Sequence, residues 1–72
     1  MDTGLVGRIG RVELAIDGGE VPGEALIGGA GVRESYIAYA DEAIAADESV
    51  LVTEDLGDRR VRVVPWLDVD AR

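Results

Sequence analysis

The 72 residues suffice for one small domain, and they include neither cysteine nor histidine, which excludes a disulfide framework and thiolate or imidazole metal sites. Seven basic residues, all arginine, against fifteen acidic ones give 7 − 15 = −8, a net charge that opposes binding to nucleic acid and to anionic membrane surfaces. The sequence also lacks both an apolar run of about eighteen residues and a signal peptide.

The segment from Leu5 to Ile16 is predicted to be the first strand, because apolar residues recur at alternate positions. Glycines at positions 4, 7 and 10 favour a sharp bend in a strand shared by both halves of a small barrel. A phosphate-binding glycine loop is disfavoured because it needs a lysine, and the chain has none. The mainly apolar alternate set, the better candidate for the core, comprises Val6, Arg8, Gly10, Val12, Leu14 and Ile16.

A turn and a second strand are predicted next. Asp17-Gly18-Gly19 supplies the positive φ of a tight hairpin, and Glu20 to Ile27 follows as a strand. Pro22 cannot donate a ladder hydrogen bond, so we expect it at an edge, at a bulge or near the strand start. Residues 28–31, Gly-Gly-Ala-Gly, are predicted to be a flexible loop, since they lack the spacing of a dinucleotide-binding fingerprint.

The third predicted strand, Glu34 to Ala40, carries two tyrosines. Tyr36 and Tyr39 fall on opposite faces of a strand, which counts against a base-stacking platform. We expect one tyrosine to pack inward with its hydroxyl satisfied and the other to cover part of the surface.

The segment from Asp41 to Glu48 is rich in alanine and compatible with one or two turns of helix, with Asp41 as a possible N-cap. Ile44, its only large apolar residue, is expected to plug one end of the barrel. The four carboxylates do not follow the spacing of a calcium loop, so a solvated acidic cap is favoured.

The last predicted element is a hairpin from Ser49 to Leu67. Its turn is expected at residues 55–58, with Gly57 in the left-handed conformation, and Pro65 should end the regular pairing. Arg60 and Arg62 alternate with core residues and are expected to face solvent. Four valines are predicted to face the core: Val50, Val52, Val61 and Val63.

Trp66 follows this hairpin, and two interpretations remain open. It can fold back with Leu67 as a lid over a barrel mouth, or it can be a binding hot spot. Residues 68–72 are expected to be a frayed tail, so that the chain 1–72 is one domain with an ordered core of about residues 5–67.

Together these elements predict an all-β fold. Five strands, the first long and bent, with at most a short helical turn between strands three and four, follow the order of an OB-fold-like Greek-key barrel. Closure of the barrel suits a short chain without cross-links, because it pairs every strand edge.

The order of turn and core residues resembles the C-terminal soluble domain of the NfeD-like proteins. The second half carries the stronger likeness: residues 38–44, Ala-Tyr-Ala-Asp-Glu-Ala-Ile, then Val50-Leu51-Val52, and Gly57-Asp58 leading to Val61-Arg62-Val63. Gly4 to Gly10 with Val12 is similar to the opening G-x-x-G strand of that family, and Gly19-Glu20-Val21 with Gly23 to its second strand. The chain departs from the pattern by one extra residue between Gly57 and Val61 and by lacking the glycine that often follows the Ile turn.

The resemblance implies a soluble barrel tethered to a membrane in the full-length protein. It does not imply on which side of the membrane the barrel lies. It also implies a non-catalytic role beside a stomatin-, prohibitin- or flotillin-like membrane partner. Longer relatives carry a serine protease domain, but the only serines here, Ser35 and Ser49, lack a G-x-S-x-G motif and a histidine base. We expect no cofactor, no metal, no membrane insertion by this segment and a monomeric isolated domain.

Candidate partner-binding residues are Tyr36, Tyr39 and Trp66. The tyrosines are chosen because OB barrels usually bind through strands two and three, here residues 21–27 and 35–39, and Trp66 because a lone tryptophan at a strand end can be a binding hot spot. The alternative function is an oligonucleotide-binding OB domain, which would need a basic groove on this acidic chain. A carboxylate enzyme such as a glycosidase is disfavoured, since so small a barrel has no cleft to desolvate its acids.

Overall fold

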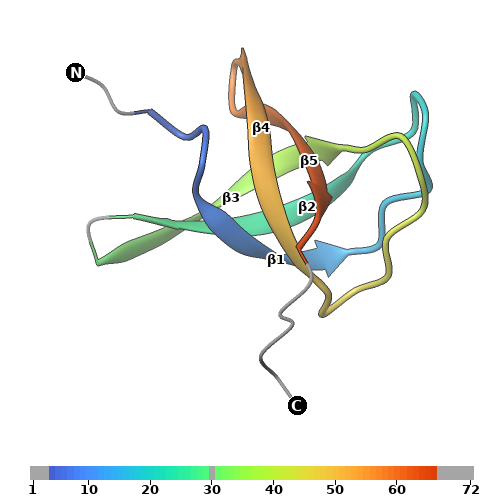
Figure 1. Cartoon of the computed structure of the whole chain (residues 1–72), viewed down its shortest axis with the longest axis horizontal. Coiled ribbons are helices and arrows are strands. Elements are labelled where there is room, and N and C mark those ends of the chain that lie inside the picture. The colour runs from blue at the N-terminus through green and yellow to red at the C-terminus, as the bar shows by residue number, and fades with distance from the viewer. Residues whose placement is uncertain (1–3, 30, 67–72) are drawn as a thin grey trace.

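The computed structural model describes residues 4–29 and 31–66, which form five strands in a closed barrel (Figure 1). The strand order around the barrel is β1-β2-β3-β5-β4, with β3 and β5 parallel and every other pair antiparallel. This order confirms the predicted OB-fold-like barrel. The strands are β1 (Ile9–Leu14), β2 (Gly23–Gly29), β3 (Val32–Tyr39), β4 (Ser49–Gly57) and β5 (Arg60–Pro65).

The core of the barrel is made of small aliphatic side chains. Every strand contributes to it, and no polar or charged side chain of the described residues is buried. Valine and alanine suit the narrow interior of a five-stranded barrel, and their burial is the main favourable term in its stability. All four valines predicted for the last hairpin belong to this core, which comprises Val12, Ile16, Ala25, Ile27, Ala38, Ala40, Ile44, Val50, Val52, Val61 and Val63.

The first predicted strand is longer than the regular strand observed. Backbone hydrogen bonds extend it at both ends, from Gly7 to Val52 and between Ile16 and Ile44. The prediction that Val6 and Leu14 face the core is wrong, since they are 59% and 57% exposed. For Leu14 the cause is a register shift after Val12, which brings Leu14 opposite Glu24 and so turns it to the outer face.

Gly10 lies where β1 crosses two neighbouring strands, opposite Ile27 of β2 and Val50 of β4. A Cβ atom at this position would overlap the backbone carbonyl of Leu26 and lie 2.6 Å from Cδ1 of Ile27. Gly10 is therefore a position where β1 and β2 approach too closely for any side chain.

The turn between β1 and β2 has the positive φ values that the sequence predicts, 103° at Gly18 and 62° at Gly19. Pro22 immediately precedes β2, as expected for a residue without an N–H. The loop predicted at residues 28–31 is shorter, because Gly28 and Gly29 belong to β2 and pair with Arg33 and Val32. This pairing lengthens the β2–β3 hairpin, which projects from the barrel (Figure 1).

The connection from Asp41 to Glu48 contains turns and one bridge but no helix, so the helical turn allowed by its composition does not form. Asp47 has φ of 75°, which a continuous helix does not allow, and its N–H donates to the carbonyl of Val12. Ile44 pairs with Ile16 and is 4% exposed, which confirms its place in the core. The tertiary hydrogen bonds to β1 outweigh the weak helix propensity of so short a segment.

The hairpin of β4 and β5 turns later than predicted. Its turn residues are Asp58 and Arg59, both with positive φ, 54° and 60°, as in a type I′ turn. Gly57 has the expected positive φ but closes β4 opposite Arg60. Register shifts between Val52 and Glu54 and between Asp55 and Gly57 accommodate extra residues, which the sequence pattern does not reveal. The predicted tail, 68–72, and Leu67 lie outside the described residues.

Candidate functional site

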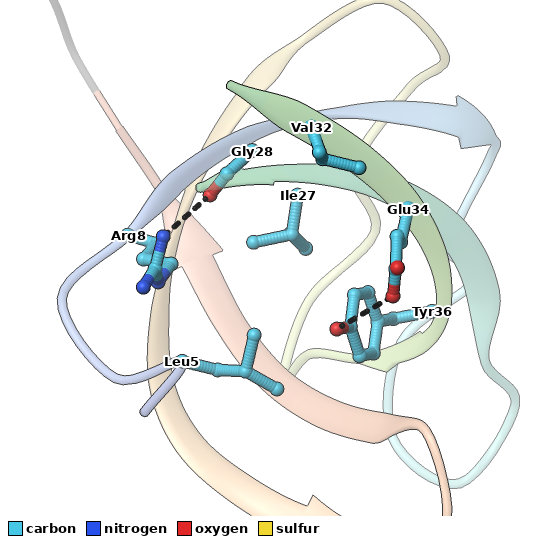
Figure 2. A pocket seen from close by; sticks show the side chains of 7 residues that line it. All are labelled: Leu5, Arg8, Ile27, Gly28, Val32, Glu34 and Tyr36. Carbon is cyan, nitrogen blue, oxygen red and sulfur yellow. Dashed lines mark hydrogen bonds between the residues drawn. The ribbon is translucent and has the colours of Figure 1, made fainter. Parts of the chain in front are cut away.

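A cavity of about 320 Å³ opens on the inner face of the β2–β3 hairpin (Figure 2). The antiparallel register aligns Ile27 with Glu34, and Ala25 with Tyr36, so the side chains at these positions share one face. Ile27 and Leu5 line the cavity from within, and Tyr36 forms a wall. The complete lining is Leu5, Arg8, Ile27, Gly28, Val32, Glu34 and Tyr36.

Polar contacts fix the rim of this cavity. The guanidinium of Arg59 lies over the ring of Tyr36, 4.9 Å from its centre, and pairs with Oε1 of Glu34 at 3.2 Å. The Tyr36 hydroxyl donates to the same Glu34 oxygen at 3.4 Å, and Arg59 also donates to the carbonyl of Ser35 at 3.0 Å. On the other side, Arg8 donates to the carbonyl of Gly28 at 3.2 Å. Tyr36 is thus held in one orientation while its ring stays half-buried.

A second cavity, of about 410 Å³, contains the other tyrosine. It lies between the β1–β2 turn and the β4–β5 hairpin, and Tyr39 of β3 lies between them. Loops one-two and four-five of an OB fold flank the usual ligand-binding cleft, so this cavity occupies that position. Its lining comprises Gly19, Glu20, Tyr39, Leu56, Arg60 and Arg62.

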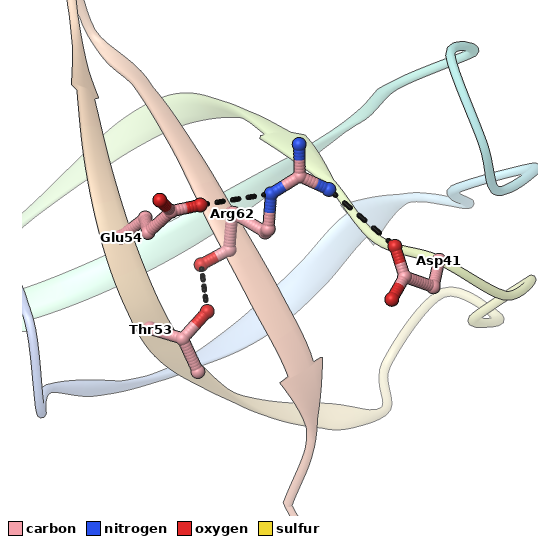
Figure 3. A network of polar contacts seen from close by, with 4 residues as sticks. All are labelled: Asp41, Thr53, Glu54 and Arg62. Carbon is pink, nitrogen blue, oxygen red and sulfur yellow. Dashed lines mark hydrogen bonds and ion pairs between the residues drawn. The ribbon is translucent and has the colours of Figure 1, made fainter.

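The arginines of the second cavity are paired with acids of the same chain. Arg62 donates from Nε to Glu54 at 3.0 Å and from an Nη atom to Asp41 at 3.5 Å, and its carbonyl accepts from Thr53 (Figure 3). Arg60 lies 3.9 Å from Asp58 and donates to the backbone carbonyls of Gly57 and Leu56. These exposed ion pairs leave little positive charge to attract a polyanion.

Trp66 lies apart from both tyrosines. Its backbone N–H donates to the carbonyl of Ser49 at 2.9 Å, and the residue is 42% exposed. The chain follows β4 as far as Trp66. The lid interpretation includes Leu67, which lies outside the described residues, so it stays a prediction beside the hot-spot interpretation. The three candidate residues do not converge: Tyr36 and Tyr39 point to opposite faces of β3, as the alternation predicts, and Trp66 follows β5.

Sequence reasoning missed most of the partners around Tyr36. Glu34 could have been found from the strand period, since it shares a face with Tyr36. Leu5 and Arg59 could not, because only closure of the barrel brings them beside β3 from distant parts of the chain.

The described part of the chain offers neither a metal centre nor a membrane-spanning helix. Residues 4–29 and 31–66 contain no group of three histidine, cysteine, aspartate or glutamate residues able to hold a metal ion. They also contain no helix that is long and apolar enough to cross a membrane.

Comparisons with known proteins agree with each other. The model of the NfeD C-terminal domain matches residues 9–64, from the first residue of β1 to the penultimate residue of β5. The chain is also similar to the solution structure of the soluble domain of the NfeD protein YuaF from Bacillus subtilis, with 30% sequence identity and a TM-score of 0.70. This similarity covers 82% of the chain and 70% of the YuaF chain. No curated protein matches the sequence.

Proposed function

The chain belongs to the NfeD C-terminal domain family, and on this premise we propose that it is a non-catalytic protein-interaction module. It is the soluble domain of a protein tethered to a membrane, and it acts beside a stomatin-, prohibitin- or flotillin-like partner. The observation that carries the proposal is the family match over nearly the whole barrel, residues 9–64.

The distribution of polar groups supports binding in preference to catalysis. None of the described acidic side chains is buried, and the polar contacts around the tyrosines lie at the surface. General acids and bases are usually tuned by removal from water, which these side chains do not undergo. A rigid surface with half-buried aromatic residues suits recognition of another protein.

The cavity at Tyr36 is the better candidate for the partner's anchor residue. Its apolar lining, Leu5, Ile27 and Val32, can accept an apolar side chain, and its rim offers Glu34 and Arg8 for polar contacts. Its volume of about 320 Å³ lies near the lower end of the range for ligand pockets. Because Arg59 already holds Tyr36 in place, little side-chain entropy is lost on binding.

The proposal is tested by affinity capture of the tagged full-length protein from detergent-solubilised source cells, with bound proteins identified by mass spectrometry. We expect enrichment of a stomatin- or flotillin-like protein over an unrelated acidic barrel. Tyr36→Ala should then weaken binding of that partner by about tenfold or more, as at an interface hot spot. Leu14→Ala is the matched control, since Leu14 is exposed and lines neither tyrosine cavity. Failure to enrich such a partner would refute its role, and unchanged binding by folded Tyr36→Ala would refute this anchor.

Oligonucleotide binding is the alternative function, favoured by the position of Tyr39 beside Arg60 and Arg62. The acids paired with these arginines and the net charge of −8 oppose it. Fluorescence anisotropy with single-stranded oligonucleotides at low salt distinguishes the two functions, and we expect no tight binding.

A further inference from the structure

A row of apolar side chains crosses the outer face of the barrel. Ile9 of β1 pairs with Leu51 of β4, which pairs with Val64 of β5. Directly paired residues point to the same face, and the neighbouring Val50 and Val63 are buried, so this row faces outward. Ile9 is 47% and Val64 39% exposed, and Leu51 is half-buried. We name these three residues the outer row.

A groove of about 530 Å³ begins at Ile9 and extends over β1 and β2. Its apolar surface is continued by Leu26 of β2, which pairs with Arg11 of β1. Gly28, also in the groove, pairs with Arg33 of β3 and presents no side chain. Two arginines thus lie beside Leu26 and Ile9, and Ile9 belongs to the outer row.

These two arginines differ from the others in the described chain. Arg59, Arg60 and Arg62 are each paired with an acid, and Arg8 donates to two backbone carbonyls. Arg11 and Arg33 make neither an ion pair nor a side-chain hydrogen bond within residues 4–29 and 31–66, and both are exposed. On a chain with fifteen acids, two arginines in one groove that have no acidic partner within residues 4–29 and 31–66 form a site for negative charge.

The groove also has an acidic end. Glu13 lies further along β1, and Asp47 donates its N–H to the carbonyl of Val12 beside it. Neither acid is within ion-pair distance of Arg11 or Arg33. The charge therefore changes sign along the groove, with the positive part next to Ile9 and Leu26.

We propose that this outer groove binds an acidic, aliphatic segment of a partner protein. Its carboxylates pair with Arg11 and Arg33, and its aliphatic side chains cover Ile9, Leu26 and the rest of the outer row. Charge complementarity selects this occupant, because the end of the groove that holds Arg11 and Arg33 is a local exception on a strongly acidic molecule. The groove shares only Gly28, which has no side chain, with the Tyr36 cavity and no residue with the Tyr39 cavity, so the inference does not depend on the function proposed above.

Other occupants are less compatible with the charge of the chain. A second copy also carries −8, and an anionic membrane meets the same repulsion, whereas a short acidic segment can enter the groove without facing the whole acidic surface. Both are outcomes that the test distinguishes.

The test is a titration of the isotopically labelled chain with a short peptide of alternating leucine and glutamate, followed by amide chemical shifts in NMR spectra. We expect shifts to concentrate at Ile9, Arg11, Leu26 and Arg33. Peptides with serine in place of leucine, or lysine in place of glutamate, should bind more weakly. The double variant Arg11→Gln/Arg33→Gln should weaken binding by about tenfold, as the loss of two exposed ion pairs allows.

A matched control separates the groove from the overall charge. Val21→Glu/Ala43→Glu lowers the net charge by the same two units at exposed positions outside the groove. It should retain most of the affinity, and Tyr36→Ala should retain all of it. Equal weakening in the control, shifts centred on Tyr36 or Tyr39, or equal binding of the lysine peptide would overturn the proposal. So would groove shifts that depend on protein concentration without peptide, or binding to anionic vesicles in place of the peptide.

Discussion

At Gly10 the packing of the barrel leaves no room for a side chain. Strand β2 comes so close to β1 at this point that a methyl group would overlap the carbonyl of Leu26 and the Ile27 side chain. Backbone atoms on paired strands cannot move apart without breaking ladder hydrogen bonds. We therefore expect Gly10→Ala to lower the free energy of unfolding by about 1–3 kcal/mol, the usual cost of overpacking.

Urea denaturation of Gly10→Ala measures this cost directly. Gly28→Ala is the control, because a Cβ there would meet only Cγ of Arg33, at an ordinary contact distance of 3.8 Å. The control should change stability by less than about 0.5 kcal/mol. Equal stability of the two variants would mean that β1 can shift away from β2.

At the scale of single residues, the sequence could predict which side chains share a strand face but not which distant residues meet them. Tyr36 and Tyr39 diverge as the two-residue period requires, and the valine pairs enter the core. Arg59 contacts Tyr36 only because the β4–β5 turn is placed beside β3 by barrel closure. A local pattern carries no information about that juxtaposition.

At the scale of elements, bulges account for most departures from the predicted strands. The alternation that predicts a buried Leu14 is correct at Val12 and fails at the register shift that follows. It also fails at Val6, which lies before β1 begins. Similar shifts in β4 move the hairpin turn from residues 55–58 to Asp58 and Arg59. A bulge turns the residue beside it to the other face without a distinct sequence signal, as at Leu14, although Ile16 further along is buried as predicted. The glycine turns, in contrast, were predictable from their conformational freedom.

The β4–β5 turn carries backbone strain that two substitutions can isolate. Arg59 has φ of 60°, a conformation that costs a non-glycine residue about 1 kcal/mol relative to glycine. Arg59→Gly and Arg59→Ala both remove the contacts with Tyr36 and Glu34, but only glycine relieves the strain. We expect Arg59→Gly to be the more stable of the two by about 1 kcal/mol in thermal or urea unfolding. If Arg59→Ala were as stable as Arg59→Gly, the turn would not be restrained in the type I′ conformation.

At the scale of the whole molecule, topology was the most predictable feature. A chain of 72 residues without cysteine, histidine or a long apolar helix has few ways to protect its strand edges, and closure into a barrel is one of them. The small valine and alanine core fits only a narrow barrel. The same composition leaves every acid of residues 4–29 and 31–66 unburied, which makes the electrostatics of this part of the chain predictable as well.

This acidic surface should make the folded state sensitive to salt. The net charge of −8 repels itself more strongly in the compact state than in the unfolded chain, while the four ion pairs join side chains that are 39–95% exposed and contribute little. Added sodium chloride screens the repulsion over a Debye length of about 8 Å at 0.15 M. We expect the free energy of unfolding to rise by about 1 kcal/mol between low and moderate salt, which is roughly 4–8 °C in Tm for a domain of this size.

The Val21→Glu/Ala43→Glu variant, with a net charge of −8 − 2 = −10, should gain more stability from the same salt, as followed by thermal unfolding in circular dichroism. A Tm that falls with salt would mean that the ion pairs around Arg59, Arg60 and Arg62 outweigh the repulsion among the acids.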